Sequence, residues 1–368
     1  HTVQLNCLAS DITIIAGMAD YPAAVVHSNF DPATMASGSV GTGPFVLESH
    51  EVGVKSVSVK NEGFDWWGYS AGRTCPLDRI EFIDYGTDPA AWLAAAEADE
   101  VDCFYENVGE YVDIMEGIGW ENSEIATGST ILIRPNQTSP DADGNTVYAD
   151  KRVRQALAMA VDNNICLELG YANKGQAADN HHAGPMHPEH DASVGRLPYD
   201  PAKAKSLMAE AGMADYEHEL ISIDDDWRKN TTDAVAAQLR DAGIKVKRTI
   251  LPGSTFWNDW AKYPFSSTNW NHRPFATQVW GLAYRSGEAW NEMGWSNAEF
   301  DALLAEANAI ADADKRRAVA GKCQALIAEE GCTIQPYWRS LYRSHSSDTV
   351  CDMHIAYHAH VYKWGFKA

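Results

Sequence analysis

The sequence has little positive charge. Its 368 residues include 51 acidic residues against 29 lysines and arginines, which gives a formal net charge of −22, and no cluster of basic residues interrupts the acidic background. Such a chain repels phosphate backbones and anionic membrane surfaces. We therefore expect no nucleic acid among its partners, and the strong net charge favours a protein that stays monomeric.

The sequence also lacks a long apolar run and paired cysteines. No stretch approaches the roughly 20 apolar residues that cross a bilayer, and the N-terminal HTVQLNCLAS has neither the basic nor the apolar part of a signal peptide. We therefore expect a soluble chain. The seven cysteines contain no CxxC pair, which argues against a zinc ribbon or a thioredoxin-like motif. A bridge between Cys332 and Cys351 is one option in an oxidising compartment, but the sequence does not rank the pairings.

Signatures of catalysis are missing as well. The chain has no GxSxG, no HExxH and no P-loop, and none of its cysteines lies in a recognisable nucleophile context. We therefore expect a binding protein without enzymatic activity and without a cofactor. Pairs of acidic residues are too numerous to be diagnostic, so an enzyme or a sensor domain that reuses the same fold stays open as an alternative.

The chain is rich in large aromatic side chains between residues 267 and 301. This segment, STNWNHRPFATQVWGLAYRSGEAWNEMGWSNAEFD, holds four tryptophans, two arginines, one histidine and one tyrosine, and its pattern is mostly that of a loop. Tryptophan and arginine offer much contact area and many hydrogen bonds for the conformational freedom they lose. The segment therefore predicts a surface that binds a small molecule.

The order of predicted elements indicates an α/β architecture. Alternation predicts strands over residues 39–60 and 79–85, a helix at 89–99 that begins with Asp88 and Pro89, and a further strand at 101–105. Helices and strands then alternate to the C-terminus, and Ser296 and Glu299 suggest a capping box before a helix at 300–310. The polar stretch at 136–146 predicts a boundary between two lobes.

Seven motifs in a fixed order resemble one family. They are GTGPF at 41–45, NEGFDWWG at 61–68, LDRIEF at 77–82, AWLAAAEADEVD at 91–102, DKRVRQALAMAVD at 150–162, YDPAKAKSLMAEAG at 199–212 and SNAEFDALLAEA at 296–307. Each motif is weak alone, but together they resemble the extracellular solute-binding proteins of ABC transporters, family 5, in the peptide/nickel (dipeptide- and oligopeptide-binding) group.

The resemblance implies a two-lobed periplasmic-binding-protein fold, type II-like and of cluster C, with a hinge and a ligand cleft between the lobes. Family members are longer, so the chain resembles a form without its N-terminal part. We expect residues 1–40 to be a remnant of the preceding domain, residues 41–140 with 345–368 to form lobe I, and residues 141–344 to form lobe II. The hinge is expected near 136–146 and 340–348.

The resemblance also implies a function and a compartment. We expect a high-affinity periplasmic or extracellular, secreted receptor that binds a small polar ligand and delivers it to the permease subunits of an ABC transporter. Relatives bind peptides, nickel complexes, haem, oligosaccharides and opine-like compounds, so the resemblance leaves the ligand open. A metal or metallophore binder and an oligosaccharide or opine binder on the same scaffold are the alternatives.

One departure from the family pattern concerns Trp270 and Arg273. Peptide-binding relatives carry a tryptophan followed three residues later by an aspartate, which pairs with the α-amino group of the peptide. Here that third position is Arg273, whose guanidinium accepts no hydrogen bond and repels an ammonium. The ligand is therefore expected to present a carboxylate, a phosphate or a hydroxyl-rich group to Arg273, while Trp270 stacks beside it. The alternative is that Arg273 pairs with a surface acid. Further candidate ligand-binding residues are Asn269, His272, Tyr284, Arg285, Trp290 and Trp227.

A histidine-rich stretch, NHHAGPMHPEHD, invites a metal interpretation, because imidazole suits Zn, Ni and Cu. Pro185 and Pro188 impose an extended path, so the four rings cannot share one helical face. We favour a rigid loop between the lobes in which the histidines bond backbone groups, and we keep a metal site as the alternative. The four histidines are His181, His182, His187 and His190.

Overall fold

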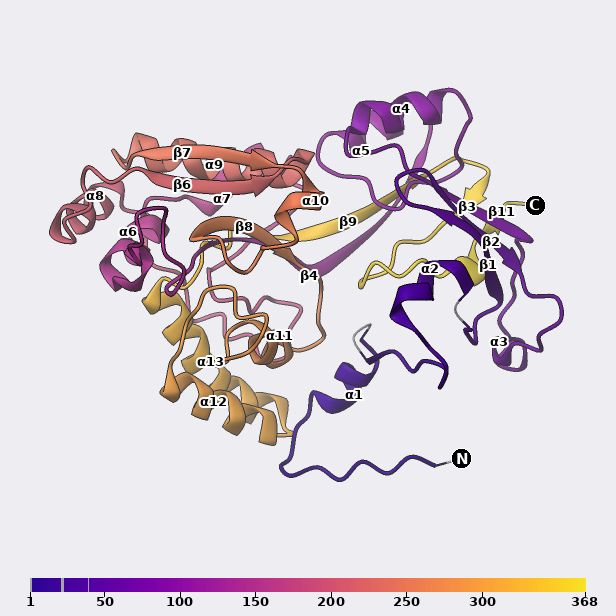
Figure 1. Ribbon diagram of the computed structural model, residues 1–368, viewed down its shortest axis with the longest axis horizontal. Coiled ribbons are helices and arrows are strands. Elements are labelled where there is room, and N and C mark those ends of the chain that lie inside the picture. The colour runs from indigo at the N-terminus through magenta and orange to yellow at the C-terminus, as the bar shows by residue number, and fades with distance from the viewer. Residues whose placement is uncertain (1, 21–22, 39) are drawn as a thin grey trace. The chain divides into compact units, whose positions relative to one another are not determined.

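The computed structural model describes residues 2–20, 23–38 and 40–368, and these residues form two compact units (Figure 1). The larger unit joins the N-terminal residues up to Ala19 with Ala126–Ser340, and the smaller unit joins Asp20–Ile125 with Leu341–Ala368. Of the predicted remnant at 1–40, residues 1, 21–22 and 39 lie outside the described part. The described residues up to Ala19 belong to the larger unit. In this segment the Ile12 N–H donates to the Asn308 carbonyl (3.0 Å).

The boundaries between the two units lie at other positions than the sequence predicted. The chain passes from one unit to the other between Ile125 and Ala126 and again between Ser340 and Leu341, not at 140 and 344. Both crossings fall inside long strands, β4 (Glu121–Pro135) and β9 (Tyr337–His345). The last nine residues of β4 are all buried, because this half of the strand lies inside the sheet of the larger unit. The polar stretch at 136–146 is therefore a loop within the larger unit.

The larger unit is built on a six-stranded mixed sheet with the order β5-β9-β4-β8-β6-β7. Strand β6 runs parallel to β7 and β8, whereas β8 is antiparallel to β4 and β5 is antiparallel to β9. The remaining strands of this sheet are β5 (Gly175–Ala177), β6 (His218–Ile223), β7 (Val246–Leu251) and β8 (Phe265–Trp270). Nearly every residue of β6 and β8 is buried, as expected for strands covered on both faces, whereas the edge strand β7 is mostly partly exposed.

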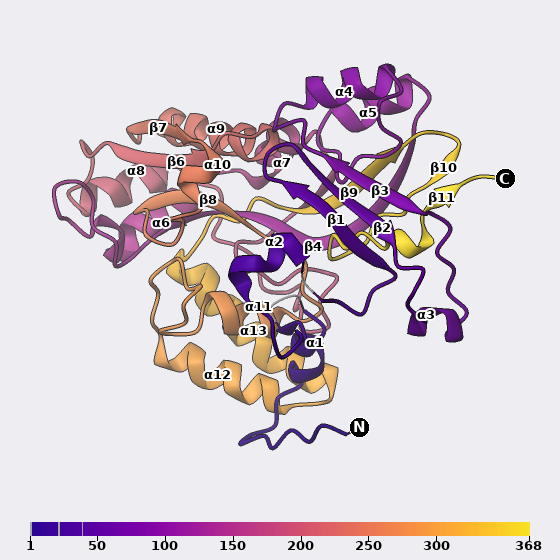
Figure 2. The ribbon, with the colours of Figure 1, turned by 45° about the vertical axis from the view of Figure 1, so that its right-hand side comes forward.

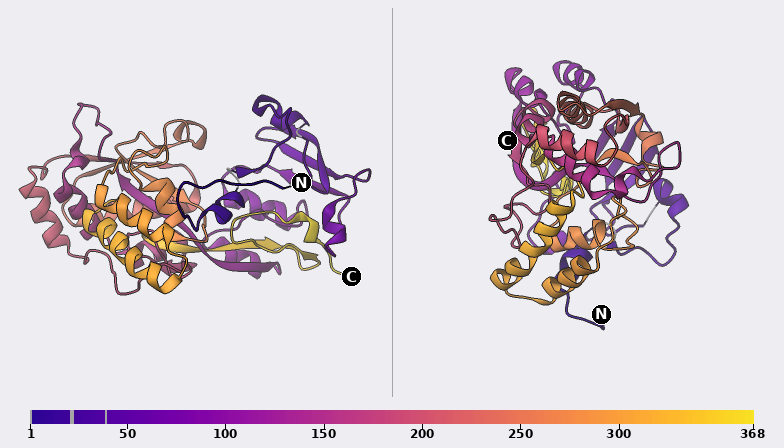
Figure 3. Two further views of the ribbon diagram at one scale, coloured as in Figure 1. Left: turned by 90° about the horizontal axis from the view of Figure 1, so that it is seen from below. Right: turned by 90° about the vertical axis from the view of Figure 1, so that its left-hand side faces the viewer.

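Helices flank this sheet and pack in pairs. In Figure 1, α9 runs beside β6 and β7, and Figures 2 and 3 show α12 and α13 side by side. Their first turns are closed by the side chains of Asp150, Asp162, Asp200, Asp225, Asn297 and Asp312, which accept backbone N–H bonds. The helices are α1 (Ile14–Met18), η3 (Val147–Ala149), α6 (Lys151–Met159), α7 (Asn163–Tyr171), α8 (Pro201–Glu210), α9 (Asp226–Asp241), α10 (Gly253–Phe256), α11 (Ala276–Ala283), α12 (Ala298–Ala309) and α13 (Ala313–Glu330).

The aromatic segment at 267–301 is less loop-like than its sequence suggests. It includes the end of β8, the whole of α11 and the start of α12. Trp280 and Trp295 are buried in a core cluster with Phe300, Leu304 and residues of α13, and the Trp280 indole N–H donates to the His181 carbonyl (3.0 Å). Trp270 belongs to the same buried cluster and Trp290 packs against it, so all four tryptophans of the segment contribute to this core.

The smaller unit contains a three-stranded antiparallel sheet in the order β1-β2-β3, and a two-stranded pair, β10 and β11. The predicted strand at 101–105 is wrong: within this stretch only Cys103 forms an isolated bridge, with His345 of β9, and the next bridge, Asn107 with Tyr342, follows after it. The elements are η2 (Pro32–Thr34), α2 (Met35–Gly38), β1 (Phe45–Glu51), β2 (Lys55–Lys60), α3 (Trp67–Ser70), β3 (Arg79–Ile83), α4 (Pro89–Glu97), α5 (Tyr111–Gly117), β10 (Thr349–Val350), η4 (Val361–Lys363) and β11 (Gly365–Phe366).

All seven cysteines lie in the described part of the chain, and all are free thiols. Cys332 belongs to the larger unit and Cys351 to the smaller one.

Candidate functional site

The end of β8 and the turn after it position the central candidate residues. Asn269 and Trp270 lie opposite Ile131 and Thr130 of β4, and the chain then leaves the sheet through His272 and Arg273. Trp270, His272 and Arg273 are all buried. The pairing of β8 with β4 therefore fixes the backbone position of Trp270 and the point at which the chain turns toward His272 and Arg273.

A buried acid holds the Trp270 indole. The Nε1–H of Trp270 donates to a Glu292 carboxylate oxygen (2.7 Å), and the Thr268 hydroxyl donates to the same carboxylate (2.7 and 2.8 Å). Glu292 also forms an ion pair with the Arg134 guanidinium, and both side chains are fully buried. Because Glu292 is itself held by Thr268 of β8 and Arg134 of β4, the indole edge of Trp270 has one preferred orientation.

Histidine rings from two separate segments meet beside Trp270. His182 lies edge-to-face against Trp270 (ring centroids 6.0 Å apart), and the His187 and His272 rings are stacked (6.2 Å, 11°). Trp338 of β9 contacts both His182 and His187. Burial lowers the pKa of His187 to about 3 and holds the pKa of His182 well below its usual range. The His182 and His187 rings are therefore neutral at physiological pH.

Hydrogen bonds orient the three rings. His182 Nδ1 lies 3.2 Å from the Tyr284 hydroxyl, and His187 Nε2 lies 3.1 Å from the Arg273 carbonyl. His272 Nδ1 accepts the backbone N–H of Gly128 (3.0 Å), and the backbone N–H of His272 donates to the Ser129 hydroxyl (3.1 Å). The His187 and His272 rings thus lie between Arg273 and β4.

Gly128 leaves the space that the stacked rings need. A Cβ at this position would lie 2.9 Å from His272 Nδ1 and 3.0 Å from His187 Nε2. We expect Gly128→Ala to displace both rings and to lower the free energy of unfolding by about 1–3 kcal/mol, as over-packing does. Urea denaturation measures the change. The matched control is Gly195→Ala, because a Cβ at Gly195 meets nothing within 4 Å. Equal stability of the two variants would contradict the packing argument.

Arg273 is a buried cation, with only 4% of its surface exposed. Its Nη1 donates to the Asn271 carbonyl (3.1 Å) and weakly to the His272 carbonyl (3.5 Å). The guanidinium therefore bonds the backbone of its own loop, at the two residues that precede Arg273.

Comparison with known proteins places this geometry in a family. The sequence pattern of the bacterial extracellular solute-binding proteins, family 5 Middle, matches residues 1–291. The chain belongs to this family. Family 5 proteins are binding proteins and not enzymes, which agrees with the missing catalytic signatures and with the resemblance in the seven motifs.

Individual relatives differ in what their names say they bind. Heme-binding protein A of Haemophilus influenzae is 25% identical, and the match covers 89% of this chain and 61% of that protein. NikA from Staphylococcus aureus in complex with Ni(L-His)2 superposes with a TM-score of 0.83 at 16% identity, over 98% of this chain and 76% of that one. AgaA from A. tumefaciens R10 in complex with agropinic acid gives a TM-score of 0.81 at 17% identity, over 98% and 74%. The two structures establish the α/β periplasmic-binding-protein fold.

This family 5 chain is shorter than its relatives. It spans about six-tenths of the length of the curated relatives that it matches. Among the described residues, no helix combines the length and the apolar character that a membrane crossing requires.

Four further candidate residues lie in contrasting surroundings. Tyr284 is fully buried at the end of α11, and burial raises its pKa well above the usual range. Trp290 packs edge-to-face on Trp270 (5.9 Å), so the two indoles form one group. The Asn269 amide oxygen accepts from Arg228 Nε (2.9 Å). Arg285 is exposed and pairs with Glu288 (3.1 Å), away from the buried group.

Trp227 lies elsewhere, within a pair of guanidinium groups on α9 and β9. The Arg339 guanidinium carbon is 3.7 Å from the centre of the indole ring, and that of Arg228 is 4.5 Å from it. Only 3% of Trp227 is exposed. Its contacts are those of a packed core residue with cation–π neighbours.

The four histidines of the loop do not come together as one set. His181 and His190 approach Asp179, with potential ligand atoms within 4.8 Å of one another. His182 instead lies against Trp270, and His187 against Trp338. His181 Nε2 is bonded to the Val194 carbonyl (3.1 Å), and His187 Nδ1 accepts the Gly184 N–H (2.9 Å). A metal ion would have to replace these backbone bonds.

Sequence reasoning missed several residues of this group. Glu292, Trp338, Gly128 and Arg134 are separated in sequence by up to some two hundred residues, and each belongs to an ordinary pattern of its own. A hint was available for one of them, because an isolated acid between Trp290 and Trp295 is unusual in a buried aromatic stretch.

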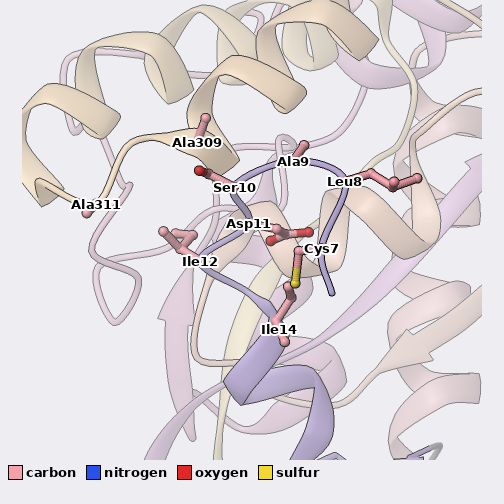
Figure 4. A pocket seen from close by; sticks show the side chains of 9 residues that line it. All are labelled: Cys7, Leu8, Ala9, Ser10, Asp11, Ile12, Ile14, Ala309 and Ala311. Carbon is pink, nitrogen blue, oxygen red and sulfur yellow. The ribbon is translucent and has the colours of Figure 1, made fainter. Parts of the chain in front are cut away.

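A shallow pocket lies elsewhere in the larger unit, where residues 7–14 meet the end of α12 (Figure 4). Its only carboxylate, that of Asp11, accepts bonds from the Thr13 N–H (2.8 Å) and hydroxyl (2.7 Å). The lining shares no residue with the Trp270 group, and we do not assign a ligand to it. The residues that line it are Cys7, Leu8, Ala9, Ser10, Asp11, Ile12, Ile14, Ala309 and Ala311.

Proposed function

We propose that this chain is the solute-binding component of an ABC import system, active in the periplasm or outside the cell, where it hands its ligand to permease subunits. Membership in family 5 over residues 1–291 supports the role of a solute receptor. The import system, the permease and the compartment follow from the family and are part of the proposal.

We propose further that the ligand is a small anionic compound of peptide-like or opine-like character. The observation that carries this ligand class is Arg273, a buried cation in the turn that follows β8, three residues after Trp270. Neutral His182 and His187 add polar contacts without adding charge. A carboxylate matches the planar donors of Arg273, and a flat or aliphatic body matches the indoles.

The relatives support this range. One is named for heme, one was solved with a nickel–histidine complex and one with agropinic acid, and each of these ligands carries carboxylates. Of these three ligands, an opine such as agropinic acid fits a buried arginine most simply, because an opine retains acidic groups while its amine is modified.

Native mass spectrometry of the protein purified without unfolding tests the ligand class directly. We expect either a copurified small acid or, with ligand-free protein, a rise in melting temperature on adding opine-type amino-acid conjugates, because a ligand that binds only the folded state stabilises it. A panel of unmodified dipeptides and neutral sugars is the comparison. Stabilisation by sugars or by unmodified dipeptides, with none by the acidic conjugates, would overturn the proposed ligand class.

A further inference from the structure

Three histidines of the smaller unit meet in the segment that follows β10. His354, His358 and His360 belong to the stretch MHIAYHAH, and each offers a ring nitrogen that lies within 4.8 Å of the other two. His354 and His360 are half-buried, and His358 is exposed. The cluster lies in another unit than the Trp270 group, so it is independent of the solute site proposed above.

The spacing of the rings is close to that of a three-histidine metal site. The ring centroids are 4.3 Å apart for His354 and His360, 5.0 Å for His354 and His358, and 6.0 Å for His358 and His360. Three imidazoles that bind one ion at about 2.0–2.1 Å in tetrahedral geometry have ring centres about 5 Å apart. Small rotations of the side chains therefore suffice to aim three nitrogens at one point.

The backbone brings the rings together through a fixed turn. Tyr357 has a left-handed conformation (φ 62°), and its N–H donates to the His354 carbonyl (2.9 Å). Its carbonyl accepts the Tyr105 hydroxyl (2.8 Å), and its own hydroxyl donates to Glu106 (3.0 Å). A non-glycine residue keeps a positive φ only where its surroundings hold it. The turn between His354 and His358 is thus anchored at both ends of the tyrosine.

The ring nitrogens leave room for an ion at a modest cost. Nδ1 of His360 is buried and has no hydrogen-bond partner among the residues that the structure describes. Nδ1 of His354 accepts the Ala356 N–H at 3.2 Å, a long bond that would be lost if this ring changed its tautomer to bind through Nε2. A buried lone pair without a donor costs free energy, and a bound cation would remove that cost.

Nearby charges act in both directions. Lys363 and Arg343 are close enough to disfavour positive charge on His354, while Asp352 favours it. Lys363 lies 3.7 Å from Asp352 and is about half exposed. The ammonium group should therefore weaken the binding of a cation without preventing it.

We propose that His354, His358 and His360 form a binding site for one divalent transition-metal ion of borderline character, such as Zn²⁺, Ni²⁺ or Cu²⁺. Imidazole nitrogens are the ligands that these ions share. Three protein ligands leave at least one coordination position, which takes water or a donor atom of a small molecule.

Calorimetric titration of the metal-free chain with ZnCl2, in a buffer that does not chelate, tests the site. We expect one Zn²⁺ per chain, and His358→Gln to weaken binding at least tenfold, since even changes to groups that only orient a metal ligand cost about 10–100-fold. His358 is exposed, so this variant should fold. His27→Gln, which removes an exposed histidine elsewhere in the smaller unit, should change nothing. Lys363→Met should strengthen binding.

Two outcomes would overturn the proposal. One is Zn²⁺ binding that His358→Gln leaves intact while His190→Gln removes it, because the ion would then belong to the cluster of Asp179, His181 and His190. The other is the absence of any Zn²⁺, Ni²⁺ or Cu²⁺ binding by a folded chain. Substitution with Co²⁺ gives a further readout, because the visible spectrum of the loaded protein reports nitrogen ligands and coordination number. Neither outcome depends on whether the chain binds an anionic solute.

Discussion

Replacement of Arg273 by alanine is expected to weaken binding of the anionic solute by about 2–5 kcal/mol, which is the cost of truncating one partner of a desolvated charge pair. Arg273 is 4% exposed, so its interaction with a carboxylate would be screened little by water. Arg273→Lys should keep the charge but lose the two-pronged contact, and we expect an intermediate affinity. Isothermal titration with the acidic ligand found by native mass spectrometry measures both variants.

The control for this experiment is Arg79→Ala. Arg79 lies on β3 of the smaller unit, is about half exposed and pairs with Glu48 (2.6 Å), so its loss removes the same formal charge without touching the buried group. Circular dichroism of the Arg273 variants checks that they fold. Undiminished affinity for the acidic ligand in folded Arg273→Ala, or binding of an unmodified dipeptide at full affinity in that variant, would refute the assignment of Arg273.

Replacement of Glu292 by glutamine is expected to lower the free energy of unfolding of the larger unit by about 3–5 kcal/mol, because it leaves the guanidinium of Arg134 buried without its counter-charge. Both side chains are fully buried, and Glu292 also accepts bonds from Thr268 and Trp270. Desolvation already lowers the pKa of Arg134, which shows how strongly this position disfavours an uncompensated cation. Urea denaturation followed by tryptophan fluorescence measures the loss.

A surface pair of the same unit provides the comparison. Glu329 is about two-thirds exposed and pairs with Lys151 (2.9 Å), so Glu329→Gln should cost less than about 1 kcal/mol. The double variant Arg134→Met/Glu292→Leu should recover much of the lost stability, since replacing a buried pair by apolar side chains is often neutral. Similar losses in Glu292→Gln and Glu329→Gln would show that the buried network does not support the fold as argued.

Local chemistry was readable where a few neighbouring residues decide the outcome. Asp88 with Pro89 and Asp200 with Pro201 begin helices as their sequence indicated, because a capping carboxylate and a fixed proline φ need no distant partner. Gly331 ends α13 in the left-handed conformation for the same reason. The capping box at Ser296 is displaced by one residue: the Asn297 side chain accepts the N–H groups of Glu299 and Phe300 instead. Two adjacent polar residues compete for one cap, and only the geometry of the first turn chooses between them.

The candidate site shows what local sequence patterns cannot predict. The sequence singled out Trp270, His272 and Arg273, but it treated His182 and His187 as part of a rigid loop whose histidines bond backbone groups, with a metal site as the alternative. It gave no role to Glu292 or Trp338. These residues meet because β8, β9 and the histidine loop converge in the larger unit. Contacts between residues so far apart leave no periodic trace in a single sequence, since each partner obeys only the pattern of its own element.

The sequence by itself determined that this is an acidic α/β protein of the solute-binding kind, because composition, capping residues and the order of short motifs are local properties. Tertiary structure alone decided that the polar stretch at 136–146 lies within one unit and that the chain changes units inside β4 and β9, since the burial of a strand depends on what pairs with it. It alone decided that Arg273 is buried and that three C-terminal histidines converge, because a turn held by Tyr105 and Glu106 lies some 250 residues from the partners that fix it.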